Sequence, residues 1–95
     1  MAIHVVLLNF TEQGRKNIKG TVDRSRAVRA DNERRGIKTH GIYWTQGQYD
    51  IIAIFEGDET ALTAATLNIL AAGNLRATTL RAFTESEVEA ALAKI

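Results

Sequence analysis

The chain has no cysteine and no proline among its 95 residues. Without cysteine there is no disulfide, no thiolate nucleophile and no cysteine-ligated metal, as is typical of a reducing compartment. Turns must then be formed by glycine, asparagine, aspartate and threonine. No apolar run approaches the roughly 18 residues that would indicate a membrane-spanning helix, and residues 1–5 alternate like a strand instead of forming a basic leader. We therefore expect a cytoplasmic protein with no membrane partner.

A strong net charge is also missing, because 12 basic residues nearly balance 11 acidic ones. The charges are unevenly placed: residues 15–38 hold nine basic and three acidic side chains, whereas residues 50–95 hold three basic and seven acidic ones. Such regions can complement each other within the fold or between subunits. A net charge of +1 attracts phosphates only weakly, so we expect no nucleic-acid partner.

Apolar and β-branched runs predict four strands, at residues 3–10, 37–45, 48–56 and 75–83. Gln46-Gly47 is expected to join the second and third strands in a tight hairpin. Between and after the strands, capping residues and helical spacing predict a short turn over 14–19, a long helix from the N-cap Thr21 to about Arg35, a second helix from Gly57 or Asp58 to Gly73, and a tail helix. The tail helix opens on a capping box, Thr84-Glu85-Ser86-Glu87.

This βαββαβ order with a C-terminal helix predicts a single α+β domain over residues 1–95. The expected fold is ferredoxin-like, with an antiparallel four-stranded sheet that carries both main helices on one face. The long helix has a weak apolar stripe, so we expect it to contribute little to the core.

The third strand is apolar at both parities from Ile51 to Phe55. A strand that is apolar on both sides needs two covers, and the helices of so short a chain can cover only one face of a sheet. We therefore expect the other face to meet a second copy, in a homodimer or a larger closed homo-oligomer with an enclosed interior.

Three blocks of sequence narrow the prediction further. Thr11-Glu12-Gln13-Gly14 is followed by Ile18-Lys19 and Arg24, then by Gly47-Gln48-Tyr49-Asp50, then by Gly73-Asn74-Leu75-Arg76-Ala77-Thr78-Thr79-Leu80-Arg81-Ala82-Phe83. Over about residues 3–84 this pattern resembles the GYD-domain family. The resemblance implies a dimeric α/β barrel, in which two ferredoxin-like sheets pack face to face. It implies no single activity, because the wider superfamily mixes cofactor-free monooxygenases, isomerases, haem-handling enzymes and non-catalytic binders.

Tyr49 and Asp50 are adjacent on the predicted third strand, so only one of them can face an interior. An inward Tyr49 would orient an apolar ligand through its hydroxyl, and an inward Asp50 would be a candidate general base. The structural alternative is a packed Tyr49 ring and an Asp50 carboxylate that pairs with an arginine or a backbone amide.

His40 is the second candidate base. It and His4 are the only histidines, too few for a metal site in one chain, and we expect no metal and no cofactor. Arg81 could bind a ligand carboxylate or bridge to an acidic residue. Asn9, Lys19 and Arg24 would suit a small anion, although a packed loop needs the same donors.

Two functions remain open from the sequence. The first is a homo-oligomeric small-ligand-binding or regulatory and assembly domain of unknown specificity. The alternative is a cofactor-independent enzyme, similar to monooxygenases or isomerases, that acts on a small apolar or aromatic acid in the barrel interior. In that case Asp50 or His40 would be the base, and Tyr49 or Arg81 would orient the substrate.

Overall fold

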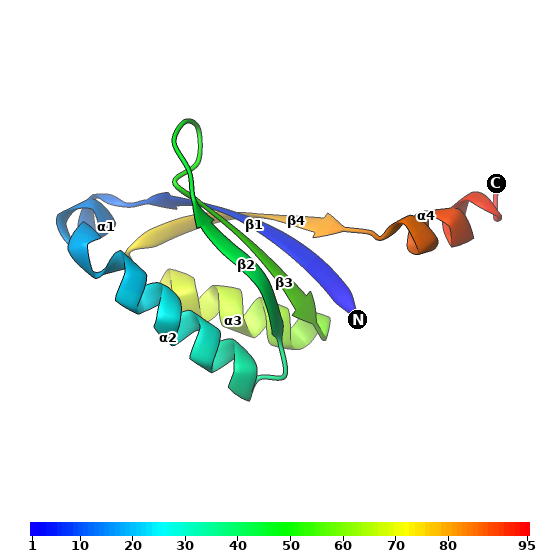
Figure 1. Cartoon of the computed structure of the whole chain (residues 1–95), viewed down its shortest axis with the longest axis horizontal. Helices are drawn as coiled ribbons and strands as arrows, with labels where there is room; N and C mark the ends of the chain where they lie inside the picture. The colour runs from blue at the N-terminus through cyan, green and yellow to red at the C-terminus, as the bar shows by residue number, and fades with distance from the viewer.

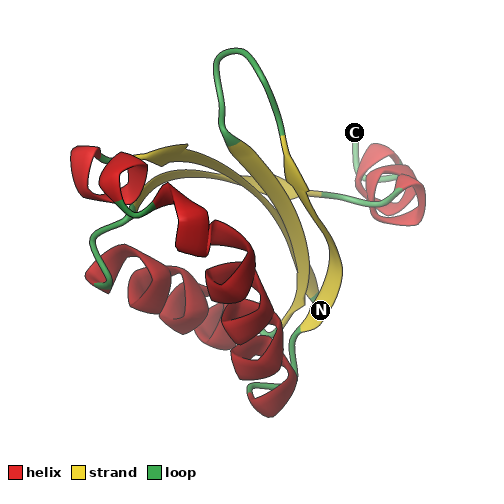
Figure 2. Ribbon diagram, turned by 60° about the vertical axis from the view of Figure 1, so that its left-hand side comes forward, coloured by secondary structure: helices red, strands yellow, loops and turns green.

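Four strands form one antiparallel sheet in the computed structural model, which describes residues Met1 to Ile95. The strands are β1 (Ala2–Phe10), β2 (Lys38–Trp44), β3 (Ile51–Gly57) and β4 (Leu75–Ala82), in the order β2-β3-β1-β4. Helices α2 (Thr21–Arg34) and α3 (Glu59–Ala71) lie side by side on one face of the sheet (Figure 1; Figure 2). This arrangement confirms the predicted ferredoxin-like α+β fold.

Three shorter helical elements complete the chain: α1 (Glu12–Lys16), the 3₁₀ turn η1 (Ile18–Gly20) and α4 (Glu85–Leu92). The capping box of α4 is confirmed, since the Thr84 side chain accepts from the Glu87 amide while the Glu87 carboxylate accepts from the Thr84 amide. Asp58 caps α3. The predicted N-cap of α2 is wrong by one residue: Thr21 is the first helical residue, and Gly20 precedes it without a side-chain cap.

The connection between β2 and β3 differs from the predicted tight hairpin. β3 begins at Ile51 instead of Gln48, and residues 45–50 form a loop in which the Thr45 amide donates to the Asp50 carbonyl over 2.8 Å. Gly47 has φ 125°, which favours glycine there. Because Tyr49 and Asp50 lie in this loop, the alternation of a strand does not decide where their side chains point.

The hydrophobic core lies between the sheet and the helices. Its fully buried side chains come mainly from alternate positions of β1 and β3 and from α3: Val6, Leu8, Ala53, Phe55, Leu62 and Ala65. By contrast, α2 has a single buried residue, the polar Asn32. The weak contribution of α2 that its sequence predicted is thus confirmed.

The second face of the sheet is covered by no helix (Figure 2). Strand register places cross-strand neighbours Leu80, Val5 and Ile54 in one row and Leu7, Ile52 and Tyr43 in the next. We call this surface the open sheet face, formed by Ile3, Val5, Leu7, Tyr43, Ile52, Ile54 and Leu80. Leu80 is 48% exposed and Tyr43 57%. β3 is therefore apolar on both faces, and the helices of the chain cover only one of them.

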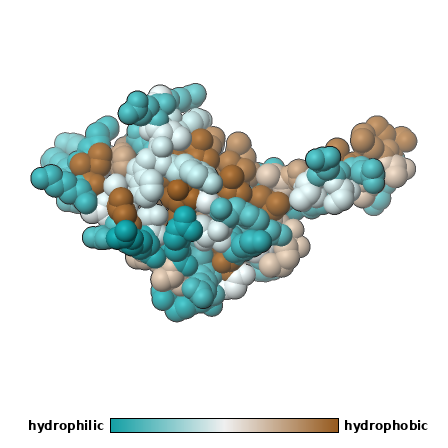
Figure 3. All heavy atoms as spheres, viewed as in Figure 1, coloured by the Kyte–Doolittle hydropathy of each residue, from teal (hydrophilic) through white to brown (hydrophobic).

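The tail helix α4 extends away from the sheet beyond the end of β4 (Figure 1). Its large apolar side chains are exposed, together with one in the segment that leads to it: Phe83, Val88, Leu92 and Ile95. Hydrophobic atoms accordingly gather at the far end of the tail (Figure 3). None of the helices combines the length and apolarity that crossing a bilayer requires.

Candidate functional site

Two of the blocks that characterise the sequence meet at the end of β1. The Thr11 amide donates to the Asn74 carbonyl over 3.0 Å, and the Thr11 hydroxyl donates to the Gly73 carbonyl over 2.6 Å. The Gln13 side-chain amide donates to the Ala72 carbonyl (3.0 Å) and to Asn74 Oδ1 (3.2 Å). These residues therefore bind the β1–α1 turn to the α3–β4 turn.

Asp50, the candidate base, forms hydrogen bonds to the end of β1. Its Oδ2 accepts from the Phe10 amide over 2.9 Å, while its own amide donates to the Leu8 carbonyl over 2.9 Å. The Tyr49 carbonyl accepts a hydrogen bond from the Thr45 hydroxyl. Asp50 thus holds the β2–β3 loop against the end of β1, which is the backbone-amide alternative considered from the sequence.

Replacing Asp50 with alanine is expected to destabilise the protein by about 1 to 3 kcal/mol, because the half-buried Phe10 amide loses a charged acceptor. Asp50→Asn should cost less, since the amide oxygen can still accept. Urea unfolding followed by circular dichroism measures both free energies. If Asp50→Ala were as stable as the wild type, this structural role of Asp50 would be contradicted.

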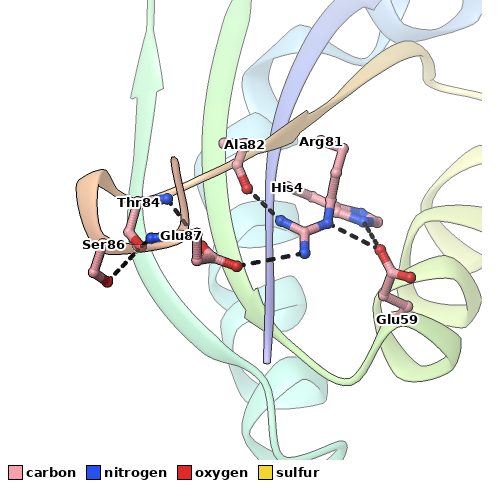
Figure 4. Close-up of polar contacts among 7 residues, drawn as sticks. All are labelled: His4, Glu59, Arg81, Ala82, Thr84, Ser86 and Glu87. Carbon is pink, nitrogen blue, oxygen red and sulfur yellow. Dashed lines mark hydrogen bonds and ion pairs between the residues drawn. The ribbon is translucent and has the colours of Figure 1, made fainter. Parts of the chain in front are cut away.

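Arg81 lies on the helix side of β4 in a chain of polar contacts (Figure 4). Its Nε donates to Glu59 Oε1 over 3.1 Å, and its Nη2 lies 3.9 Å from Glu87 Oε2. His4 Nε2 lies 3.8 Å from the same Glu59 oxygen, and the Phe83 ring centroid is 4.5 Å from the Arg81 guanidinium carbon. The guanidinium therefore joins α3 to the root of the tail, and its neighbours come from this chain.

Acid is expected to loosen the tail helix. Hydrogen bonds from Thr84, helped by the charge of Arg81, hold the pKa of Glu87 below its ordinary value of 4.5. A carboxyl with a lowered folded-state pKa stabilises the fold above its ordinary pKa, and this stabilisation is lost as the pH falls through the lower value. The amide signals of Val88 and Leu92, followed by NMR, should shift towards unfolded positions below about pH 4.

Glu89→Ala is the matched control, because Glu89 has no capping role, and it should keep the acid response. Glu87→Ala should fray α4 already at neutral pH. An α4 that is unchanged in Glu87→Ala would contradict the role of this cap.

His40 stands at one end of the open sheet face. Its Nε2 lies 2.8 Å from Oε1 of Glu56, which continues the outward parity of Ile52 and Ile54. Asn9 follows the outward residues of β1 at the opposite end, beside Arg76. The open sheet face therefore has an apolar middle and polar ends.

A cleft of about 330 Å³ lies on the other side of the sheet, between α2, α3 and the strands. Its apolar floor includes Leu8, Ile42, Ile51, Ala53 and Phe55, and its polar lining includes Thr21, Arg24, Ser25, Asn32 and Asn68. Of the three residues predicted to gather around an anion, Arg24 alone lines this cleft. Asn9 lies on the opposite face of the sheet, and Lys19 belongs to η1.

Sequence reasoning missed Asn32 and Ser25. The weak apolar stripe of α2 could have indicated them, because polar residues stand at positions of this helix that face the sheet. No three histidine, aspartate or glutamate side chains are grouped so that they could hold a metal ion.

Comparison with models of protein families identifies a family for this chain. The family model described as "GYD domain" matches residues 4–92. No curated protein and no solved structure matches the chain.

Proposed function

The chain belongs to the GYD domain family, and from this premise we propose that it works as a homo-oligomeric small-ligand-binding or assembly domain. Two copies pack open sheet face to open sheet face and form a dimeric α/β barrel. The single observation that carries this proposal is the uncovered apolar face of the sheet, whose middle rows combine Val5, Ile54 and Leu80 with Leu7 and Ile52.

The chemistry of this face favours a second copy as its cover. Burying apolar surface contributes about 25 cal/mol per Å², and monomers rarely leave a large continuous apolar patch exposed. An apolar centre with a polar rim is the usual anatomy of a protein interface. Here the rim is supplied by His40 and Glu56 at one end and by Asn9 and Arg76 at the other. A sheet of the same sequence offers the same rows, so two copies match each other in chemistry.

The tail supports contacts beyond the pair of sheets. Its apolar side chains Val88, Leu92 and Ile95 are exposed and are not among those packed against the core of their own chain, so they need a cover. The tail also carries Glu85 and Glu89, whereas α2 exposes Arg26 and Arg29. Attraction between an acidic tail and a basic helix of another copy would extend the dimer into a larger closed oligomer.

Light scattering combined with native mass spectrometry tests the proposed function. We expect a mass of twice the 10.5 kDa chain, or a higher multiple, that does not change with dilution. Native spectra would also reveal any small molecule that remains bound after purification. A mass of one chain at all concentrations would overturn the assembly.

One observation favours the enzyme alternative, a cofactor-independent enzyme acting on a small apolar or aromatic acid. The His40 imidazole and the Glu56 carboxylate form a 2.8 Å pair at the edge of the proposed barrel interior, so Glu56 can orient His40 as a general base. Chromatography with mass detection of a bound acid before and after incubation separates the two functions. An enzyme converts the acid and loses this activity in His40→Ala, whereas a binding domain returns the acid unchanged.

A further inference from the structure

The side of α2 that faces the sheet is polar where a packing helix is usually apolar. Thr21, Ser25, Val28 and Asn32 follow helical spacing along this side, and Arg24 stands beside them. Ala27 and Val28 are the only apolar residues with which α2 lines the cleft. The opposite wall, from α3, and the sheet below are mainly apolar. The cleft is therefore an apolar cavity with one polar wall.

Two polar atoms of this wall have no partner. Asn32 is 0% exposed; its Nδ2 donates to the Thr39 hydroxyl over 3.0 Å, and its Oδ1 accepts nothing. Arg24 Nη1 donates to the Asn17 carbonyl over 2.8 Å, while its buried Nη2 has no acceptor. Buried polar atoms in folded proteins nearly always have partners. Two of the chain's three such atoms belong to residues that line this cleft, the third being Thr66 Oγ1 outside it, so the cleft is a candidate ligand site.

The charges around the cleft favour an anion. Asp31, which also lines it, is neutralised by Arg35 at 2.7 Å and Arg34 at 3.4 Å, and the hydrogen bond from Arg35 holds the pKa of Asp31 below its ordinary value. Arg24 forms no ion pair with any acidic residue of the chain. A guanidinium with a free Nη2 is well suited to a carboxylate oxygen.

We propose that this cleft binds a small amphipathic carboxylic acid. The carboxylate accepts from Arg24 Nη2, and the apolar body lies over Ile42, Ile51 and Ala53. Asn32 stands eight residues further along α2, about 12 Å along the helix axis, so a hydroxyl or amine at the far end of the ligand can donate to Asn32 Oδ1. The volume of about 330 Å³ is at the small end of the range for ligand pockets, roughly 300 to 1,000 Å³, and limits the ligand to about the size of octanoate.

This inference deepens the ligand-binding part of the proposed function and rests on it. It places the ligand between the sheet and the helices, outside the barrel interior. Dimer formation and ligand binding therefore use opposite faces of the sheet and can be tested separately.

Octanoate is the probe, and the chain contains its own reporter. The only tryptophan, Trp44, donates from Nε1 to the hydroxyl of Thr21 over 3.1 Å, and Thr21 lines the cleft. We expect a saturable change in Trp44 fluorescence on titration with octanoate, confirmed by calorimetry. Octanol, which has the same chain without the charge, should bind at least about 10-fold more weakly.

Two variants and a control locate the site. Arg24→Gln should weaken octanoate binding by roughly 10- to 100-fold and leave octanol binding unchanged. Arg15→Gln removes the same charge from an exposed position on α1 that lines no part of the cleft, and it should bind octanoate like the wild type. Ser25→Leu fills the cleft, so it should abolish binding and raise the melting temperature. The rise would show that lost binding is not caused by unfolding.

The inference would be overturned if the wild type did not bind octanoate. It would also be overturned if Arg24→Gln and Ser25→Leu both bound octanoate as tightly as the wild type. In the second case ligand binding itself would stand and only its place in the cleft would be wrong. Light scattering on the same samples tests the assembly separately. If the protein is a monomer that binds octanoate through Arg24, the ligand site stands and the dimeric barrel is wrong.

Discussion

Replacing Ile54 with lysine is expected to convert the protein into a monomer. Ile54 stands in the central row of the open sheet face, with Val5 beside it on β1 and Leu80 next to Val5 on β4. In a sheet-to-sheet dimer each copy would bury one ammonium group without an acidic partner. An unpaired buried charge is strongly unfavourable, so self-association should weaken by at least about 100-fold. Light scattering at several concentrations measures the loss.

The matched control is Leu67→Lys. Leu67 lies on the outer side of α3 and is 60% exposed, so this variant makes the same chemical change away from the open sheet face. It should keep the mass of the wild type. Circular dichroism should show both variants folded, because Ile54 is outside the core that the helices cover. An Ile54→Lys protein with the mass of the wild type would contradict the proposed interface.

Gly14→Ala is expected to lower the free energy of unfolding by roughly 2 to 4 kcal/mol. A Cβ on residue 14 would lie 2.0 Å from the Asn74 carbonyl oxygen and 2.9 Å from its carbon. That carbonyl accepts from the Thr11 amide, so it cannot turn away without breaking the bond between the two turns. Urea unfolding, with the slope checked against the wild type, measures the loss.

Gly20→Ala provides the comparison. A Cβ there would meet only the end of the Arg24 side chain, with Nη1 at 2.9 Å, and the end of a long side chain can move. The change in stability should stay within about 1 kcal/mol. If Gly14→Ala were as stable as Gly20→Ala, the close approach of the two turns would not be a constraint on the sequence.

The sequence predicted those features that depend on neighbours along the chain. Alternation and apolar runs located β1 and β4 closely, and the residues Asp58, Thr84 and Glu87 cap their helices as expected. The three sequence blocks also pointed to the family whose model matches residues 4–92. What failed was the β2–β3 connection, because Asp50 is held by Leu8 and Phe10, forty residues away along the chain, and no local pattern records this contact.

The candidate site was predictable only in part. Arg24 was expected to suit a small anion and does line the cleft, whereas the sequence did not point to Asn32, since its burial and missing partner appear only after α2 is packed on the sheet. Arg81 was expected near a ligand or an acidic residue, and the fold supplies Glu59 and Glu87. Position in three dimensions decided between alternatives that the sequence had left open.

In the proposed dimer, a second copy covers the open sheet face. An isotope-filtered NMR experiment on mixed oligomers, with one copy labelled with carbon-13 and the other unlabelled, detects this contact itself. We expect intermolecular contacts between methyl groups of Leu7, Ile52 and Ile54 of one copy and the open sheet face of the other. Intermolecular contacts that come only from other surfaces, or none at all, would contradict the claim.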